Sequence, residues 1–294
     1  MEVARAAAVA APRACAADFA ELTKPRITML VLVTTAVGYA LGIRGVFAPA
    51  AFLSLLAGTA LVSGGASVLN QYWEREADGR MRRTRSRPLP SGRVSPADAL
   101  AFGLILSAAG LGLLASINGL TYFLGAAALG SYVLAYTPMK RVSSLCTVVG
   151  AVPGAIPPLM GFAAARGALE PGAWALFSVL FLWQLPHFLA IGWIYREDYA
   201  RGGFPILTVT DADGRSTGRQ AVLYAAALVP ATIAAGALAA AGAVYLWGAL
   251  LLGAAFLGCA AGFAKTRSIA WARGLFFASI LYLPVLLGLM VFDR

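Results

Sequence analysis

Long apolar runs separated by short polar segments make up almost the whole chain. We count nine such runs, and most reach the roughly 20 residues that a helix needs to cross a bilayer, the fourth being marginal. Lipid offers no partner for free backbone N–H and C=O groups, so each run is predicted to be a helix. The predicted spans are residues 27–43, 46–69, 97–117, 120–137, 142–163, 173–194, 221–239, 243–263 and 270–292.

The composition excludes an ordinary soluble domain. Of the 294 residues 60% are hydrophobic and 12% are charged, whereas a soluble domain carries about 25% charged residues. The cysteines at 15, 146 and 259 lack the spacing of a disulfide framework or a zinc site. The predicted fold class is an all-α polytopic membrane protein. Residues 1–22 are predicted to be an N-terminal cytoplasmic tail, and residues 23–294 one intramembrane domain.

The basic residues divide unevenly between the two sides that nine spans define. Twenty of the 23 Lys and Arg residues fall on the side of the N-terminus. The positive-inside rule therefore predicts an N-terminus inside and a C-terminus outside, in the cell inner (plasma) membrane. A basic inner face also attracts anionic lipid headgroups. Nucleic acid is excluded as a partner, because no soluble domain presents these residues. The exceptions are Arg44, Arg166 and Arg294.

A charged stretch, NQYWEREADGRMRRTRSRPLPSGR at 70–93, follows the second run. Asn70, Glu74 and Asp78 are four residues apart, so on a helix they share one face. One interpretation is a helix end whose acids pair with nearby arginines. The other is a row of carboxylates for a hard cation such as Mg²⁺, followed by arginines that suit phosphate oxygens. This second interpretation predicts a diphosphate site on the inner side, with functional loops at about 70–95 and 195–219.

A second acidic position follows the sixth run, in WQLPHFLAIGWIYREDYARGGFPIL at 183–207. Asp198 is expected at the inner end of the sixth helix, with Tyr195 one turn before it. His187, the single histidine, lies eleven residues before Asp198. On one continuous helix it would share the face of Asp198 and lie about 16 Å deeper.

Several sequence blocks resemble those of the UbiA-type intramembrane prenyltransferases, and within that family the branch that farnesylates haem. The family pattern N-x-x-x-D-x-x-x-D stands here as Asn70, Glu74 and Asp78, with Glu in place of the commoner Asp. The second acidic motif is reduced to Asp198. The other blocks are TKPRI at 23–27, RTRSRPLPSGR at 83–93, YTPMKR at 136–141, GAVPGAIPPLMG at 150–161, and WQLPHF with YREDYARGGFP at 183–205.

The resemblance implies transfer of the farnesyl group of farnesyl diphosphate to a vinyl group of haem b. The products would be haem O and diphosphate. It also implies Mg²⁺ bound by Glu74, Asp78 and Asp198, with Asn70 orienting a ligand or a phosphate oxygen. The helices would enclose a central cavity open to the cytoplasmic side and to lipid. Haem A synthase and the terminal oxidase assembly machinery are the candidate partners for the product. The predicted diphosphate contacts are Lys24, Arg26, Arg82, Arg83, Arg87, Lys140 and Arg141.

Roles for three further residues stay open. His187 is expected to ligate haem iron, to contact the substrate otherwise, or to bond a neighbouring helix as a neutral imidazole. Tyr136 and Tyr195 present faces that can stabilise a passing cation, or they anchor the protein at the membrane interface.

Two other functions compete with haem farnesylation. A transporter would need polar residues across the whole membrane, and the runs carry little beyond Gln184 and His187. Prenylation of a quinone precursor or another aromatic acceptor is the second alternative. Prolines 153, 157 and 158 in the fifth run are predicted to break or bend that helix, either at a cavity wall or as a packing kink.

Overall fold

A computed structural model describes residues 14–294, and every regular element in that range is helical. The helices that can span a membrane are α2 (Pro25–Gly42), α3 (Pro49–Arg80), α4 (Pro96–Ala115), α5 (Gly119–Gly130) with the π-helix η1 (Ser131–Tyr136) and α6 (Thr137–Met139), α7 (Cys146–Ala155) with α8 (Pro157–Arg166), α9 (Pro171–Ile194), α12 (Arg215–Leu238), α13 (Ala243–Thr266) and α14 (Ile269–Phe292). Three shorter helices are α1 (Ala16–Leu22), α10 (Arg196–Gly202) and α11 (Leu207–Thr210).

The span count from the sequence is confirmed. Within the described residues, nine helical stretches are long and apolar enough to cross a membrane, and each overlaps one predicted run. The largest difference is in α3, which continues to Arg80 and carries the charged residues that follow the second run. Proline stands at the first or second position of α2, α3, α4, α8 and α9, where its missing N–H costs no helical hydrogen bond.

The fifth span is broken, as its prolines predict. α7 ends at Ala155 and α8 begins at Pro157, with Ile156 between them. Pro157 and Pro158 have no N–H to donate to the preceding turn, so the hydrogen-bond ladder stops there. The fourth span is irregular in another way, because six residues of its second half form a π-helix, a conformation often found at functional sites.

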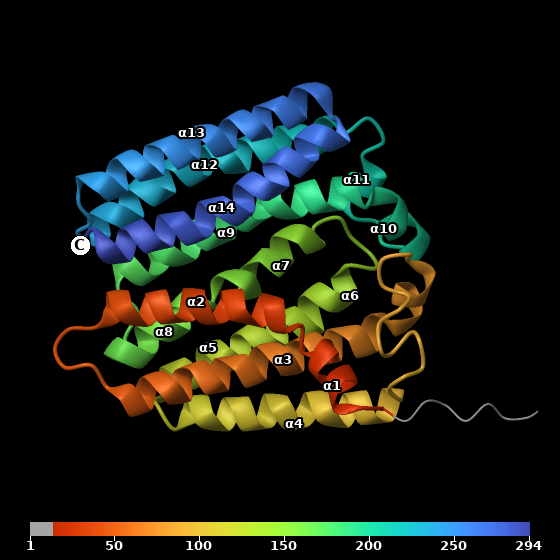
Figure 1. The fold of residues 1–294 in the computed structure, drawn as a ribbon, viewed down its shortest axis with the longest axis horizontal. Coiled ribbons are helices and arrows are strands. Elements are labelled where there is room, and N and C mark those ends of the chain that lie inside the picture. The colour runs from red at the N-terminus through yellow and green to blue at the C-terminus, as the bar shows by residue number, and fades with distance from the viewer. Residues whose placement is uncertain (1–13) are drawn as a thin grey trace, which may run out of the picture.

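The helices pack as two groups around separate apolar clusters. One cluster is built from α9, α12, α13 and α14, and includes Trp183, Phe256 and Tyr282. The other lies among the helices of the first five spans, and includes Leu114 and Met160. Figure 1 shows the α9, α12, α13 and α14 group beside the group formed by α2 to α8. The chain thus has two helical halves that lie side by side.

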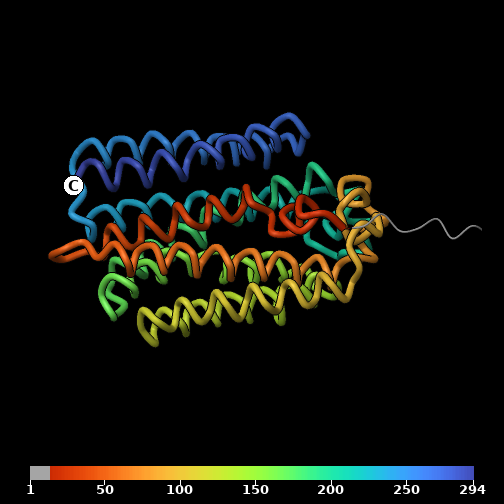
Figure 2. The backbone as a smooth tube through the Cα atoms, turned by 60° about the horizontal axis from the view of Figure 1, so that its bottom comes forward, coloured from red at the N-terminus to blue at the C-terminus, as the bar shows by residue number. Residues whose placement is uncertain are grey.

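The polar segments gather at one end of the bundle. In Figures 1 and 2, α10, α11 and the loop 81–95 lie at the end opposite the C-terminus. α1 folds against this end, because Arg93 of the loop pairs with Asp18 and, at 3.0 Å, with Glu21. Leu22 is fully buried. The packed structure therefore begins within the segment 1–22 that the sequence predicted as a tail; residues 1–13 of that segment lie outside the described part of the chain.

Candidate active site

The first three predicted site residues share one buried face of α3. Asn70, Glu74 and Asp78 are 3%, 2% and 1% exposed, whereas the side chain of Glu76 is 74% exposed. The spacing of four therefore gives the shared face that the sequence predicted. A buried carboxylate needs a partner, so the contacts of each acid define the site.

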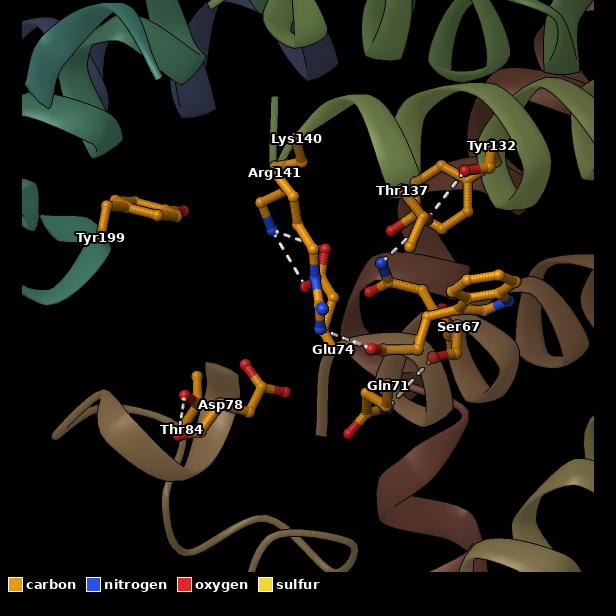
Figure 3. Close-up of polar contacts among 12 residues, drawn as sticks. Ser67, Gln71, Glu74, Asp78, Thr84, Tyr132, Thr137, Lys140, Arg141 and Tyr199 are labelled. Atoms are coloured by element: carbon orange, nitrogen blue, oxygen red, sulfur yellow. Dashed lines mark hydrogen bonds and ion pairs between the residues drawn. The ribbon is translucent and has the colours of Figure 1, made fainter. Parts of the chain in front are cut away.

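Glu74 pairs with Lys140, which follows α6 in the fourth span. Lys140 Nζ lies 3.1 Å from Glu74 Oε1 and 3.0 Å from Oε2, and Figure 3 shows the pair at the centre of the site. Burial by itself opposes a charge on Lys140, but Glu74 outweighs it and holds the pKa of the lysine well above its ordinary value. The pair is therefore ionic.

Asp78 has one occupied and one free oxygen. Its Oδ2 accepts from Arg87 Nη1 at 2.7 Å. Its Oδ1 is buried and has no hydrogen-bond partner within residues 14–294. Thr84 donates from Oγ1 to the backbone oxygen of Asp78 at 2.8 Å, which holds the turn that brings Arg87 back to α3. A buried carboxylate oxygen without a donor is a position that a cation fits.

Asp198 lies on α10, so the expectation of one helix from His187 to Asp198 is wrong. α9 ends at Ile194, and Tyr195 has φ −109° and ψ 24°, outside helical geometry. This change of direction carries Asp198 to the loop after α3. There its Oδ1 accepts from the backbone N of Arg82 at 3.0 Å and pairs with Arg201. Burial tends to raise the pKa of Asp198, but these donors lower it overall.

Asn70 joins the first span to the fourth. Its Oδ1 accepts from Lys24 Nζ at 3.2 Å, and its Nδ2 donates to Thr137 Oγ1 at 3.1 Å. Lys24 has a φ of 51°, in the left-handed region that a lysine rarely adopts. Burial and the positive charge of Arg87 lower the pKa of Lys24 to about 7. The Asn70 amide thus holds a lysine whose pKa is about 7, at the polar end of α2.

Comparison with known proteins identifies the family. The model of the UbiA prenyltransferase family matches residues 31–281. The chain belongs to the UbiA prenyltransferase family. Two similar relatives are the proteins named protoheme IX farnesyltransferase from Solibacter usitatus, 48% identical over 94% of this chain and 98% of the relative, and from Anaeromyxobacter sp. strain Fw109-5, 47% identical over 97% of each.

Solved structures agree with the fold. A digeranylgeranylglyceryl phosphate synthase superimposes with a TM-score of 0.79 at 18% identity, covering 94% of this chain and 97% of that one. A UbiA homologue from Archaeoglobus fulgidus bound to GPP and Mg²⁺ superimposes with a TM-score of 0.69 at 16% identity, covering 93% and 99%. The protein is thus a prenyltransferase with the UbiA fold.

The three predicted metal ligands of this UbiA family member each lie against a basic side chain. No three His, Cys, Asp or Glu side chains of residues 14–294 converge as a ready metal cluster. Each predicted ligand instead has its own basic partner: Lys140 for Glu74, Arg87 for Asp78 and Arg201 for Asp198. Two of these partners, Lys140 and Arg87, are among the predicted phosphate contacts, whereas Arg201 is not. The free Oδ1 of Asp78 is the observation that fits a cation.

The remaining predicted phosphate contacts do not all reach the acids. Arg83 stacks over Tyr195 at 4.9 Å and lies 3.4 Å from the Tyr199 hydroxyl. Arg141 donates to the backbone oxygen of Trp73 at 2.9 Å, next to Glu74 in the chain, and pairs with none of the three acids. Arg26 is exposed, and the structure gives it no hydrogen bond or ion pair within the described range. Of these three, Arg83 contacts α10, the helix that carries Asp198.

Sequence reasoning missed several residues of the site. Tyr132 stacks near Tyr136 at 5.2 Å, and Lys140 Nζ lies 5.7 Å from the ring of Tyr199 and 4.6 Å from that of Phe204. Figure 3 shows Tyr199 directed towards the Lys140–Glu74 pair. The signal available in the sequence was the spacing of four between tyrosines 132 and 136 and between tyrosines 195 and 199, which on a regular α-helix would place each pair on one face. Thr84, Thr137 and Arg201 had no comparable signal.

His187 lies apart from the carboxylates. It sits in α9 with its ring against α14, where Nδ1 is 2.6 Å from Ser279 Oγ. The rings of Trp183 and Phe276 stack on it at 5.4 and 5.1 Å. This hydrogen bond to α14 is the one expected of a neutral imidazole that bonds a neighbouring helix, but it uses only one of the two ring nitrogens.

Proposed function

We propose that the protein transfers the farnesyl group of farnesyl diphosphate to a vinyl group of haem b with addition of water. The products are haem O and diphosphate. The observation that carries the donor half is the set of three buried carboxylates, each paired with a base, at one end of the bundle. The acceptor half rests on the identity of 48% over nearly the full chain with a relative named protoheme IX farnesyltransferase.

Glu74, Asp78 and Asp198 are the residues proposed to hold Mg²⁺, which would neutralise the charge that develops on the departing diphosphate. In this proposal Lys140, Arg87 and Arg201 leave their carboxylates and turn to phosphate oxygens. The exchange keeps every buried charge partnered. Asn70 accepts a hydrogen bond from Lys24, which is proposed to bind the diphosphate as well.

The bond changes follow from this arrangement. The allylic C–O bond of farnesyl diphosphate breaks, and its electron pair leaves with diphosphate. The vinyl carbon of haem b forms a C–C bond to the farnesyl cation, and water captures the cation left on the porphyrin side and loses a proton. Tyr136 and Tyr195 are proposed to face the passing cation, because an aromatic face stabilises positive charge. Tyr136 lies 5.8 Å from Lys140 Nζ, beside the acids.

The active site is proposed to lie on the cytoplasmic side of the cell inner membrane. Twenty of the 23 basic residues favour that orientation. A central cavity open to the cytoplasm and to lipid would admit both substrates, since farnesyl diphosphate and haem b each combine charged groups with a large apolar body. Haem A synthase and the terminal oxidase assembly machinery are the proposed recipients of haem O.

The decisive experiment supplies the purified protein in lipid with haem b, farnesyl diphosphate and Mg²⁺, and detects haem O by mass spectrometry. We expect haem O with the wild-type protein and none with Asp78→Asn. Absence of haem O, together with prenylation of a hydroxybenzoate in a parallel reaction, would replace the haem acceptor by a quinone precursor.

A further inference from the structure

His187 is held by a two-step hydrogen-bond chain across α9 and α14. Its Nδ1 lies 2.6 Å from Ser279 Oγ, and Ser279 Oγ lies 2.5 Å from the backbone oxygen of Phe276, one turn earlier in α14. Ser279 is fully buried. These contacts join residues 92 positions apart in the sequence.

The chain fixes which ring nitrogen carries the proton. A serine hydroxyl has one hydrogen, and a backbone oxygen can only accept. Ser279 therefore donates its hydrogen to Phe276, and its oxygen accepts a hydrogen from His187. The proton of the neutral imidazole is thus on Nδ1. Nε2 carries the free lone pair, which is the form that ligates a metal.

Nε2 has no hydrogen-bond partner of its own. It makes no hydrogen bond within residues 14–294, and it is not among the fully buried side-chain atoms there that lack a partner. A histidine used only to join two helices needs no free lone pair on its second nitrogen. This arrangement suits an axial ligand whose other nitrogen is fixed by a neighbour.

From this geometry we propose that Ser279 is a positioning residue that holds His187 as the Nδ1–H tautomer and presents Nε2 to the iron of bound haem b. The inference rests on the proposed function, since it assumes haem as the acceptor. Ser279 acts through the imidazole and does not touch the reacting vinyl group.

The packing around Ser279 supports this role. Trp183 of α9 donates from Nε1 to the backbone oxygen of Ser279 at 2.8 Å, so the serine has a fixed position relative to the helix that carries His187. His187 lies seven residues before the end of α9 at Ile194, about 10 Å from that end. Stacking of the imidazole on Trp183 and Phe276 limits its rotation.

The test compares haem binding by Ser279→Ala, Ser279→Thr and His187→Ala in lipid nanodiscs. Ferric haem b is titrated and followed by its absorption spectrum, and the iron–histidine stretching band of the reduced complex is recorded by resonance Raman. We expect Ser279→Ala to weaken haem binding about 10- to 100-fold and to shift that band, as loss of an outer hydrogen bond to a ligating histidine does. Ser279→Thr keeps the hydroxyl and should restore both, while His187→Ala should lose the band.

A matched control separates this effect from a general loss of packing. Ser107→Ala removes another buried helical serine, whose Oγ donates to Gly103 at 2.7 Å, in α4. We expect Ser107→Ala to bind haem as the wild type does, and farnesyl diphosphate affinity to be unchanged in Ser107→Ala and Ser279→Ala. Retained diphosphate binding shows that each variant is folded.

Two results would overturn the proposal without touching the proposed function. The first is a Ser279→Ala protein with wild-type haem affinity and an unchanged iron–histidine band. The second is a His187→Ala protein whose haem spectrum is unchanged, which excludes ligation. Failure of the proposed function has a different signature, because the wild-type protein would then form no haem O from haem b and farnesyl diphosphate, however it binds haem.

Discussion

Each carboxylate of the site has a base of its own, and this pairing determines how single substitutions act. Glu74, Asp78 and Asp198 are all buried, and each lies against a lysine or an arginine. Removing one member of a buried ion pair leaves an uncompensated charge, which costs about 3–5 kcal/mol. A variant that keeps the shape of an acid but removes its charge therefore also leaves its basic partner unpaired.

We expect Asp78→Asn to lower turnover by at least about 100-fold, the size of effect seen when one preorganised charge-stabilising group is lost. The asparagine keeps the side-chain size but cannot balance Arg87 or offer a charged oxygen at the Oδ1 position. Haem O formed per minute at saturating Mg²⁺ is the measurement.

Glu76→Gln is the matched control for Asp78→Asn. Glu76 lies on the same helix, its side chain is 74% exposed, and its one ion pair is a 3.8 Å contact with Arg75. It should keep wild-type turnover. Equal activity of both variants would show that the charge of Asp78 is not needed.

Lys24 predicts a pH dependence of diphosphate binding. Its pKa is lowered from 10.5 to about 7, because burial and Arg87 disfavour its charge, and a bound diphosphate would favour that charge again. Binding of farnesyl diphosphate at pH 8 should therefore be accompanied by proton uptake at Lys24. The affinity for farnesyl diphosphate should fall as the pH rises above about 7. Calorimetric titrations in two buffers with different ionisation enthalpies give the number of protons taken up.

Lys24→Met should remove this proton uptake, and Lys265→Met, at an exposed basic position, should keep it.

The pH dependence of stability has the opposite sign to the pH dependence of diphosphate binding. The unfolded chain holds its lysine proton up to about pH 10.5, so between pH 7 and 10.5 it binds more protons than the native state. The contribution of Lys24 to stability therefore rises with pH over that window. The absence of proton uptake when the wild type binds farnesyl diphosphate at pH 8 would contradict a lowered pKa of Lys24.

At the scale of the helices, the closest contact between spans depends on glycine. A Cβ added at Gly161 of α8 would lie 2.0 Å from the backbone oxygen of Thr35, and one added at Gly38 of α2 would lie 2.1 Å from that of Pro158. Small residues let helix backbones approach in this way in membranes. The broken fifth span thus packs through α8 directly on the first span.

Gly161→Ala should consequently lower the unfolding free energy by about 1–3 kcal/mol, the usual cost of overpacking. Gly112→Ala in α4 is the control, because no atom lies within 4 Å of its added Cβ. The thermal unfolding midpoint in detergent is the measurement for both. A Gly161→Ala protein as stable as Gly112→Ala would mean that α2 and α8 separate at no cost.

Two irregular connections, unlike the straight helices, form the site. The bend at Tyr195 sends Asp198 to the loop after α3, and the π-helix η1 brings Tyr132, Tyr136 and then Lys140 to the acids. Proline content predicted the break between α7 and α8. The bend at Tyr195 has no proline next to it, whereas η1 lies between Gly130 and Pro138, and the sequence analysis predicted neither feature.

For the whole molecule, the charge distribution predicts which end faces the cytoplasm. The three basic residues assigned to the outside gather at the end near the C-terminus: Arg44 and Arg166 both pair with Glu170, at 3.4 and 3.1 Å, and Arg294 reaches Ala40. In both views this end lies opposite the loop 81–95. The uneven distribution of basic residues along the sequence therefore corresponds to an uneven distribution between the two ends of the folded bundle.

Cysteine labelling of whole cells tests the orientation. In a protein whose own cysteines are replaced, Ser86→Cys should react with an impermeant maleimide only after the membrane is opened, whereas Val46→Cys should react in intact cells. Both positions are exposed. A tag after Arg294 should be accessible from the outside. The reverse labelling pattern would reject the proposed orientation and place the carboxylates outside.

The sequence alone determined the number of spans, most of their boundaries to within several residues, and the shared face of Asn70, Glu74 and Asp78; the end of α3 at Arg80 is the main exception. These predictions follow from local rules: lipid forces every backbone group into a helix, and a helix places residues four apart on one side. The motifs that resemble those of the UbiA family then indicated the expected reaction, since these motifs can be read directly from the sequence.

Tertiary structure alone decided which partner each polar group has. Glu74 meets Lys140 across 66 residues, Arg82 meets Asp198 across 116, and His187 meets Ser279 across 92. The sequence offered many arginines near each acid, and nothing local distinguishes Arg87, which contacts Asp78, from Arg85, which does not. Helix packing makes that choice, because the charge of a buried group is stabilised only by what the neighbouring helices bring within hydrogen-bond distance.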